Sequence, residues 1–256
     1  MLASVNNLPC KPEAKLYTAK TQLLVSVRSA REALEAVEGG ADWIDVKEPL
    51  KGALGRAEPQ VVEDIVRVVD GRRPVTAALG ELQDLEQIRR VEWDWLSGIA
   101  IAKVGLAGCR FRSGWQREIT DLGQRLPPAT RLVVVHYADA GLCESPPIDQ
   151  VLAASIQCRS PALLVDTFHK DQGRLLDHLG TQELHRILAA TRDLGMVCVV
   201  AGSLREIDFR LVLQAGPALV AVRGAVCEGA NRESAVCRAL VARLRQALSD
   251  ELARIS

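Results

Sequence analysis

The sequence predicts an α/β fold and, within that class, a single closed (β/α)8 barrel. Three observations support this prediction: eight short apolar runs, helix signals in the segments between them, and a length of 256 residues, which suits one barrel domain. Nearly continuous apolar runs are expected of strands that are buried on both faces, as in a parallel sheet. The runs, in chain order, are 23–27, 43–46, 75–79, 99–103, 132–135, 162–165, 197–200 and 219–222.

The segments between these runs carry residues that begin and end helices. Ser29 and Glu32 have the spacing of a capping box, and Gly39 follows at the end of the same apolar face. Ser203 and Glu206 have the same spacing, which predicts a second capped helix after the seventh run. The sequence therefore predicts an alternation of strand and helix along the chain.

Eight such units without a linker favour a closed TIM barrel over residues 21–256. A doubly wound open sheet is the rival architecture, because hydrophobic periodicity does not distinguish an open sheet from a closed one. Residues 1–20 are predicted to be a short, loosely ordered N-terminal extension. This segment contains several charged residues and no continuous apolar stretch, so it is not a typical signal peptide.

The composition argues against several classes of partner. Lys plus Arg and Asp plus Glu both number 32, so no net field favours nucleic acid or a membrane surface. No apolar run reaches about 18 residues, the length needed to span a bilayer. The seven cysteines include no CxxC pair, which argues against zinc and indicates a reducing cytoplasm. The sequence leaves the oligomeric state open, a homo-oligomer included.

Charged side chains follow three of the predicted strands. Asp45 and Lys47 end the second strand, Lys103 ends the fourth, and Asp166 and Lys170 follow the sixth. Catalytic residues of barrels gather at the carboxyl ends of the strands, so these five side chains should converge on one mouth. A solvated ion pair at a strand end is the alternative for each of them taken alone.

The convergence of these lysines predicts an amine nucleophile. A lysine must lose its proton to act, and lowering its pKa from 10.4 to about 7 requires roughly 4 to 5 kcal/mol. Neighbouring cations and partial desolvation can supply that shift, and for Lys47 the candidate cations are Lys103, Lys170 and Arg223. The two aspartates are then candidates for proton transfer.

Two glycine-containing turns follow the seventh and eighth strands. They contain Gly202 with Ser203, and Arg223 with Gly224. Barrels often bind phosphate there through backbone N–H groups and a helix N-terminus, so we expect a phosphate site at these four residues. An ordinary tight turn with a helix cap is the alternative.

The sequence lacks the motifs of several other enzyme classes. HExxH, GxxxxGK[ST] and GxSxG are all absent, and we expect neither a metal nor an organic cofactor. His136 and His169 follow the fifth and sixth strands and are expected to flank the mouth. Both a catalytic and a structural role stay open for each of these histidines.

Motifs along nearly the whole chain, from Leu23 to Arg245, resemble the (5-formylfuran-3-yl)methyl phosphate synthase family. The resemblance departs from the family pattern at His136, where a glycine is common, and at Phe168 and His169. The stretches that carry it are 24–27, 39–49, 52–55, 103–106, 137–139, 165–167, 170–171, 201–204 and 223–229.

This resemblance implies a TIM-barrel lyase of methanofuran biosynthesis. Members of the family condense two glyceraldehyde 3-phosphate molecules into a phosphorylated furan aldehyde, with release of phosphate and water. By position, Lys47 matches the Schiff-base lysine. The other matching polar residues of the active site are Asp45, Lys103, Asp166 and Lys170, and those of the phosphate loops are Gly202, Ser203, Arg223 and Gly224.

The resemblance also suggests how the work is divided among these residues. Lys170 and Asp166 are the candidates for proton transfer, and Lys103 is expected to pair with a phosphate or an oxyanion. Two other functions stay open on the residues alone. One is a class I aldolase or triose-phosphate isomerase-like enzyme, and the other is a phosphosugar-binding protein without catalysis.

Overall fold

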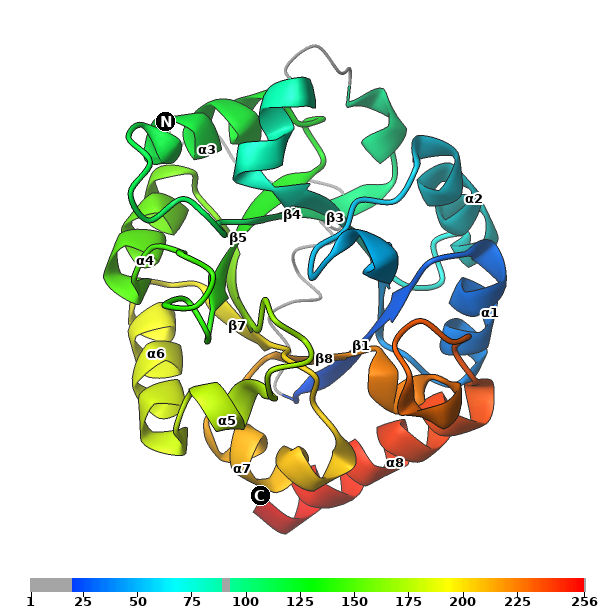
Figure 1. Ribbon diagram of the computed structural model, residues 1–256. Coiled ribbons are helices and arrows are strands. Elements are labelled where there is room, and N and C mark those ends of the chain that lie inside the picture. Colours follow the sequence, from blue (N-terminus) through cyan, green and yellow to red (C-terminus); the bar gives the residue numbers. More distant parts are fainter. Residues whose placement is uncertain (1–19, 89–92, 256) are drawn as a thin grey trace, which may run out of the picture.

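The computed structural model describes residues 20–88 and 93–255. Eight parallel strands form a closed barrel in chain order (Figure 1). The first strand pairs with the second and with the eighth, which closes the ring and excludes the open doubly wound sheet. The strands are β1 (Gln22–Val27), β2 (Trp43–Val46), β3 (Val75–Glu81), β4 (Ile99–Gly105), β5 (Arg131–Tyr137), β6 (Ala162–Asp166), β7 (Val197–Val200) and β8 (Leu219–Val222).

All eight strand predictions are confirmed in position, because each predicted run lies within one observed strand. Helices surround the barrel, and the last of them packs against both the first and the seventh, so the outer ring is closed as well (Figure 1). The α-helices are α1 (Ala30–Glu38), α2 (Pro59–Val69), α3 (Trp115–Arg125), α4 (Ile148–Gln157), α5 (Leu175–His178), α6 (Thr181–Asp193), α7 (Phe209–Gln214) and α8 (Arg238–Ile255). The 3-10 helices are η2 (Pro49–Lys51), η3 (Leu82–Ile88), η4 (Asp94–Leu96), η5 (Glu206–Asp208), η6 (Gly224–Val226) and η7 (Glu228–Ala230).

The first predicted helix cap is present in a modified form. The Ser29 hydroxyl accepts a hydrogen bond from the backbone N–H of Glu32 at 3.2 Å. The Glu32 carboxylate accepts from the N–H of Arg28 at 2.9 Å, one residue before the expected partner. Helix α1 therefore begins where the sequence predicts, and Glu32 keeps a carboxylate oxygen for a contact outside the helix.

The second predicted cap, at Ser203 and Glu206, is wrong. Gly202 and Ser203 both adopt left-handed backbone conformations, with φ of +102° and +53°, so no helix begins there. A larger residue than glycine would be crowded at position 202, because its Cβ would lie 3.0 Å from the Cβ of Leu175. The helical cap lies further along, where the N–H of Arg205 donates to Asp208 at 2.8 Å before η5.

Side chains inside the barrel alternate with side chains that face the helices. In β2, Ile44 and Val46 pack in the core between sheet and helices, whereas Trp43 packs in the core inside the barrel. Full burial of one such side chain stabilises a fold by about 1.5 to 3 kcal/mol. This alternation means that residues two apart, such as Trp43 and Asp45, point to the same side of the strand.

The predicted N-terminal extension over residues 1–20 lies outside the described residues, apart from Lys20. Within the described chain, no helix combines the length and the apolar character needed to cross a membrane.

Candidate active site

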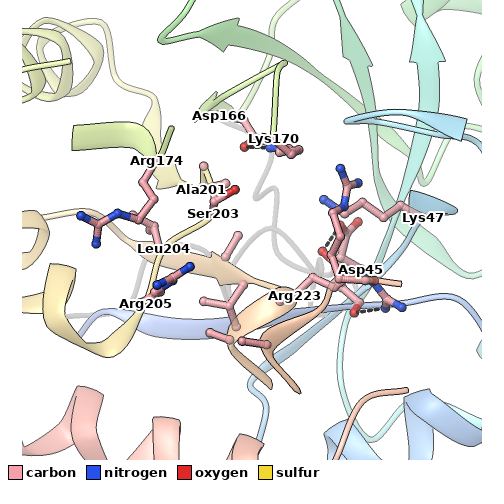
Figure 2. Close-up of a pocket in the computed structure, with 18 of the residues that line it drawn as sticks. Asp45, Lys47, Asp166, Lys170, Arg174, Ala201, Ser203, Leu204, Arg205 and Arg223 are labelled. Atoms are coloured by element: carbon pink, nitrogen blue, oxygen red, sulfur yellow. Dashed lines mark hydrogen bonds and ion pairs between the residues drawn. The ribbon is translucent and has the colours of Figure 1, made fainter. Parts of the chain in front are cut away.

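A cavity of about 740 Å³ opens at the carboxyl ends of the strands. Its wall takes residues from β1, β2, β4 and β6 and from the loops that follow β6, β7 and β8. Figure 2 shows Lys170 turned toward Asp166, with Arg174 and Arg205 on the side of the cavity away from Lys47. The structure brings all the predicted site residues to this wall: Asp45, Lys47, Lys103, Asp166, Lys170, Gly202, Ser203, Arg223 and Gly224.

Asp45 is held by three side chains, from β1, β3 and β4. Its Oδ1 atom forms an ion pair with the Lys103 amine and accepts from the Thr76 hydroxyl at 2.8 Å. Its Oδ2 atom accepts from the Ser26 hydroxyl at 2.9 Å. Burial raises the pKa of Asp45, but the charges of Lys103 and Lys47 and these hydrogen bonds outweigh burial and lower it overall. Asp45 is therefore a carboxylate, and it fixes the position of Lys103.

Asp166 and Lys170 form a second buried pair. The Lys170 amine contacts Oδ1 of Asp166 and also donates to the Thr167 hydroxyl at 3.3 Å. Burial raises the pKa of Asp166, but Lys170 and Lys47 lower it overall. Burial lowers the pKa of Lys170, and the attraction of Asp166 opposes that shift. The pair is a proton donor and acceptor at hydrogen-bond distance, with Asp166 at the end of β6 and Lys170 in the loop that follows.

Lys47 differs from the other two lysines of the cavity. Its side chain is 8% exposed, and among the described residues no group lies within hydrogen-bond distance of its amine. Burial lowers its pKa to about 7, with Asp166 opposing that shift and Lys170 adding to it. At neutral pH a large share of Lys47 is therefore an uncharged amine, which can attack a carbonyl carbon.

The causes of the lowered pKa of Lys47 differ in part from those predicted from the sequence. Desolvation is the largest cause, and Lys170 and Lys103 contribute repulsion as expected. Asp166 and Asp45 act in the opposite direction, and Arg223 is not among the main causes. Most of the charge on the neighbouring lysines is balanced by their own aspartates, so burial rather than repulsion generates the neutral amine.

The guanidinium of Arg223 donates its hydrogen bonds to other groups of the protein. Its Nη1 atom donates to the Glu32 carboxylate and to the Ser26 carbonyl, each at 2.9 Å. Its Nε atom donates to the Arg232 carbonyl, and its Nη2 atom donates to the Ser234 carbonyl at 3.3 Å. Arg223 thus connects β1, α1 and the loop after β8, and phosphate binding by its guanidinium stays a prediction.

The backbone around the predicted phosphate loops has unused donors. Gly202, Ser203, Gly224 and Ala225 all line the cavity. Their N–H groups donate to no acceptor within residues 20–88 and 93–255. Free N–H groups that line a cavity are suited to an anion. Gly202 and Ser203 lie in a turn, so their N–H groups are not at the predicted helix N-terminus. Gly224 and Ala225 are the first residues of η6, a three-residue 3-10 helix.

Sequence reasoning missed a third acidic group near the mouth, Glu81 at the carboxyl end of β3. It accepts from the Tyr137 hydroxyl at 2.5 Å and from the N–H of Ala107 at 2.9 Å. Burial raises the pKa of Glu81 to about 7, and no cation pairs with it among the described residues. Its position two residues after the third apolar run, 75–79, was the available signal.

The two histidines at the strand ends do not line the cavity. His136 is buried, its Nδ1 atom has no partner among the described residues, and burial lowers its pKa to about 4. His169 contacts Asp139 through its Nδ1 atom at 3.0 Å. Asp139 also accepts from the N–H groups of Phe168 and His169, so this cluster orders the loop that carries Lys170.

Solved structures share the fold at low sequence identity. Thiamine phosphate pyrophosphorylase from Pyrococcus furiosus superposes with a TM-score of 0.59 and 13% identity, covering 94% of this chain and 98% of that one. Phosphoribosyl anthranilate isomerase from Thermotoga maritima gives a TM-score of 0.60 and 13% identity, with coverage of 90% and 99%. At such identities the similarity shows the barrel fold alone.

Sequence comparisons are more specific. A family model described as 4-HFC-P synthase matches residues 23–245. The (5-formylfuran-3-yl)methyl phosphate synthase of Methanopyrus kandleri is 35% identical over 243 residues, which covers 90% of this chain and all of the relative. The protein of the same name from Methanosarcina barkeri is 31% identical, over 87% of this chain and 97% of the relative. The chain therefore belongs to the 4-HFC-P synthase, or (5-formylfuran-3-yl)methyl phosphate synthase, family.

Proposed function

We propose that this chain forms (5-formylfuran-3-yl)methyl phosphate from two molecules of glyceraldehyde 3-phosphate, through a Schiff base on Lys47, for methanofuran biosynthesis. The product is the one for which the matching relatives are named. One observation supports the choice of nucleophile. Of the three lysines in the cavity wall, Lys103 and Lys170 each contact an aspartate, whereas Lys47 has no such partner among the described residues and has a pKa of about 7.

The chemistry begins with addition of the neutral Lys47 amine to the aldehyde carbon of one triose phosphate. Loss of water gives an iminium, and removal of a proton from the neighbouring carbon sends the C–H electron pair into it, giving an enamine. The enamine carbon attacks the aldehyde of the second molecule and forms the new C–C bond. A hydroxyl oxygen of the second triose then attacks the regenerated iminium carbon, which closes the ring and displaces the lysine amine. Loss of water and inorganic phosphate gives the furan. No step is a net oxidation or reduction, so the scheme requires no redox cofactor.

The two aspartate–lysine pairs have separate tasks in this scheme. Asp166 accepts the proton from the α-carbon, and Lys170 at its Oδ1 atom passes that proton to a leaving hydroxyl. Lys103, fixed by Asp45, stabilises the oxyanion that forms when the second aldehyde is attacked. The unused N–H groups of Gly202, Ser203 and Gly224 hold the phosphate of the first molecule, as the position after β7 and β8 suggests.

Reduction with borohydride in the presence of glyceraldehyde 3-phosphate tests the nucleophile. The Lys47 peptide should gain the mass of a reduced triose phosphate adduct. Lys47→Ala should lose the adduct, and Lys51→Ala should keep it, because Lys51 is an exposed lysine paired with Glu58. Full turnover by Lys47→Ala would rule out this assignment.

Product analysis separates the proposed reaction from its alternatives. A furan aldehyde absorbs in the near ultraviolet, so its appearance from glyceraldehyde 3-phosphate alone supports the synthase. An aldolase or an isomerase would give no such absorbance, although an aldolase would still give a lysine adduct. A non-catalytic phosphosugar-binding protein would bind the phosphate ester without any adduct.

We also propose that the protein acts in the cytoplasm on small phosphorylated aldehydes. All the cysteines within the described residues are free thiols, which supports a reducing compartment. The test is to locate the chain by fractionation of its native cells, and a secreted protein would contradict the proposal.

A further inference from the structure

Arg232, in the loop after β8, is a half-buried cation in the cavity wall. Among the described residues, no carboxylate lies within ion-pair distance of its guanidinium. Two other arginines of the wall are different: Arg174 pairs with Asp208 at 2.7 Å, and Arg223 pairs with Glu32. An unpaired guanidinium that is partly removed from water is costly unless an anion binds beside it.

The loop that carries Arg232 is tightly organised. Cys227 and Val236 form an antiparallel bridge, and the N–H of Glu228 donates to the Ala235 carbonyl at 3.1 Å. Arg223 donates to the Arg232 carbonyl from beneath the loop. The fold therefore fixes the backbone of Arg232 over the mouth, and the role of Arg223 in the loop is to support that position.

The side chain of Arg232 reaches the loop after β2. Its Nη2 atom donates to the Gly52 carbonyl at 3.0 Å, in the turn that follows Lys47 and η2. Its charge contributes to lowering the pKa of Lys170, and the charge of Asp166 acts on Arg232 in turn. Arg232 therefore contacts the loop after β2 and interacts with the charges of the proton-transfer pair, Asp166 and Lys170. Its backbone lies close to Gly224 after β8, 3.9 Å from the position that a Cβ on this glycine would occupy.

We propose that Arg232 binds the phosphate of the second phosphorylated aldehyde, the one attacked by the enamine. This inference rests on the proposed function, since it assigns the second of two identical substrates to its own subsite. The turn N–H groups after β7 and β8 take the first phosphate, and the guanidinium of Arg232 takes the other with a planar pair of donors. The cavity volume of about 740 Å³ is in the range of sites for small ligands.

Comparison of two readouts in Arg232→Gln tests this assignment. The first readout is the glyceraldehyde 3-phosphate concentration that gives half of the maximal borohydride-trapped adduct on Lys47. It reports binding at the first subsite and should stay within about twofold of wild type. The KM for furan formation reports both subsites and should rise roughly 10- to 100-fold, the value of one lost charge-assisted contact. Arg232→Lys should recover part of this loss because it keeps a point charge.

Arg210→Gln is the matched control, since Arg210 is an exposed cation on α7 that does not line the cavity. It should leave the KM within about twofold. An equal rise in Arg210→Gln, an equal weakening of the trapped adduct in Arg232→Gln, or an unchanged KM in that variant would each overturn the assignment.

A calorimetric titration with inorganic phosphate separates this inference from the Schiff-base proposal, because it needs no covalent step. Wild type should show two sites and Arg232→Gln one. A single site in both proteins would overturn the second subsite. Two wild-type sites without any lysine adduct would contradict the Schiff base and leave the role of Arg232 in phosphate binding supported.

Discussion

The interior of the barrel has an apolar lower part and a charged upper part, built from the same strands. In β2, β4 and β6 an apolar residue points inward and is followed, two positions later, by a charged residue on the same face. The apolar members are buried in the inner core, and the charged members line the cavity. The three pairs are Trp43 with Asp45, Ile101 with Lys103, and Leu164 with Asp166.

The difference between the two parts shows how one strand can serve both stability and chemistry. Apolar side chains in the lower part gain free energy directly from burial. Charged side chains in the upper part are nearly as buried, and each is stable there only with a partner. Lys47 is the exception that lacks a partner, so at this position the fold gives up stability for reactivity.

The largest effect should come from Lys47→Met, which replaces the unpaired amine with an apolar side chain of similar length. Turnover should fall by at least about 10³-fold, because the nucleophile is lost. The free energy of unfolding at pH 7 should rise by roughly 2 to 4 kcal/mol, since the lowered pKa of Lys47 means that the unfolded chain binds its proton more tightly.

Urea unfolding at several pH values tests the sign of this effect. In wild type, the contribution of Lys47 to the free energy of unfolding should increase as pH rises from about 7 toward 10.5. Near pH 10.5 the lysine of the unfolded chain also loses its proton, so the increase should end there. Lys47→Met should lack this increase. A variant less stable than wild type at pH 7 would contradict the contrast between the two parts of the interior.

Trp43→Ala should have the opposite pattern, because it changes only the apolar part. The Trp43 side chain is 1% exposed, and its indole N–H donates to the Gln22 side chain at 2.8 Å. Its removal should lower the free energy of unfolding by about 3 to 5 kcal/mol. The trapped adduct per folded molecule should stay close to wild type at low temperature. Loss of trapping in a fully folded variant would show that the two parts are not separable.

Asp166→Asn should affect chemistry more than binding, since it removes the carboxylate from one buried pair. Turnover should fall by roughly 10²- to 10³-fold, whereas the lysine adduct should still form. Asp166 raises the pKa of Lys47, so the pH midpoint for trapping should move below its wild-type value near 7. Asp149→Asn, an exposed change in the first turn of α4, is the control and should change neither readout.

Glu81→Gln should have the smallest effect and tests a carboxyl group without a cation. The pKa of Glu81 is raised to about 7, so the folded protein binds its proton more tightly than the unfolded chain. The contribution of Glu81 to the free energy of unfolding should therefore be larger at pH 5 than at pH 8. The decrease between these two pH values should be roughly 2 to 3 kcal/mol. Glu81→Gln should remove this part of the pH dependence, as measured by urea unfolding at both pH values. An unchanged pH dependence would place a charge partner beside Glu81.

Strand positions and strand-end residues were predictable because both follow from local pattern. A run buried on both faces identifies a parallel strand, and in a barrel its carboxyl end always faces the same mouth. Asp45, Lys103 and Asp166 could therefore be placed at one cavity without knowledge of any contact. Glu81 satisfies the same rule, because it is the last residue of β3.

The contacts of Arg223 and Arg232 depend on loops. Arg223 occupies the expected position after β8, but Glu32 from α1 holds its guanidinium. Arg232 lies in the same loop and reaches the cavity because the chain folds back through a bridge between Cys227 and Val236. Neither outcome has a periodic signature, since each results from contacts between segments that are far apart in the chain.

The sequence by itself determined the positions of the eight strands, their alternation with helices and the polar residues that end each strand, because hydrophobic patterns and strand direction are encoded locally. Closure of the sheet into a barrel came from the tertiary structure, in which β1 pairs with β8. Only the tertiary structure decided which lysine has a carboxylate partner and which does not, and therefore which amine is neutral near pH 7. Desolvation and ion pairing act through space, over distances set by the closed barrel, so they cannot be assigned before the strands are assembled.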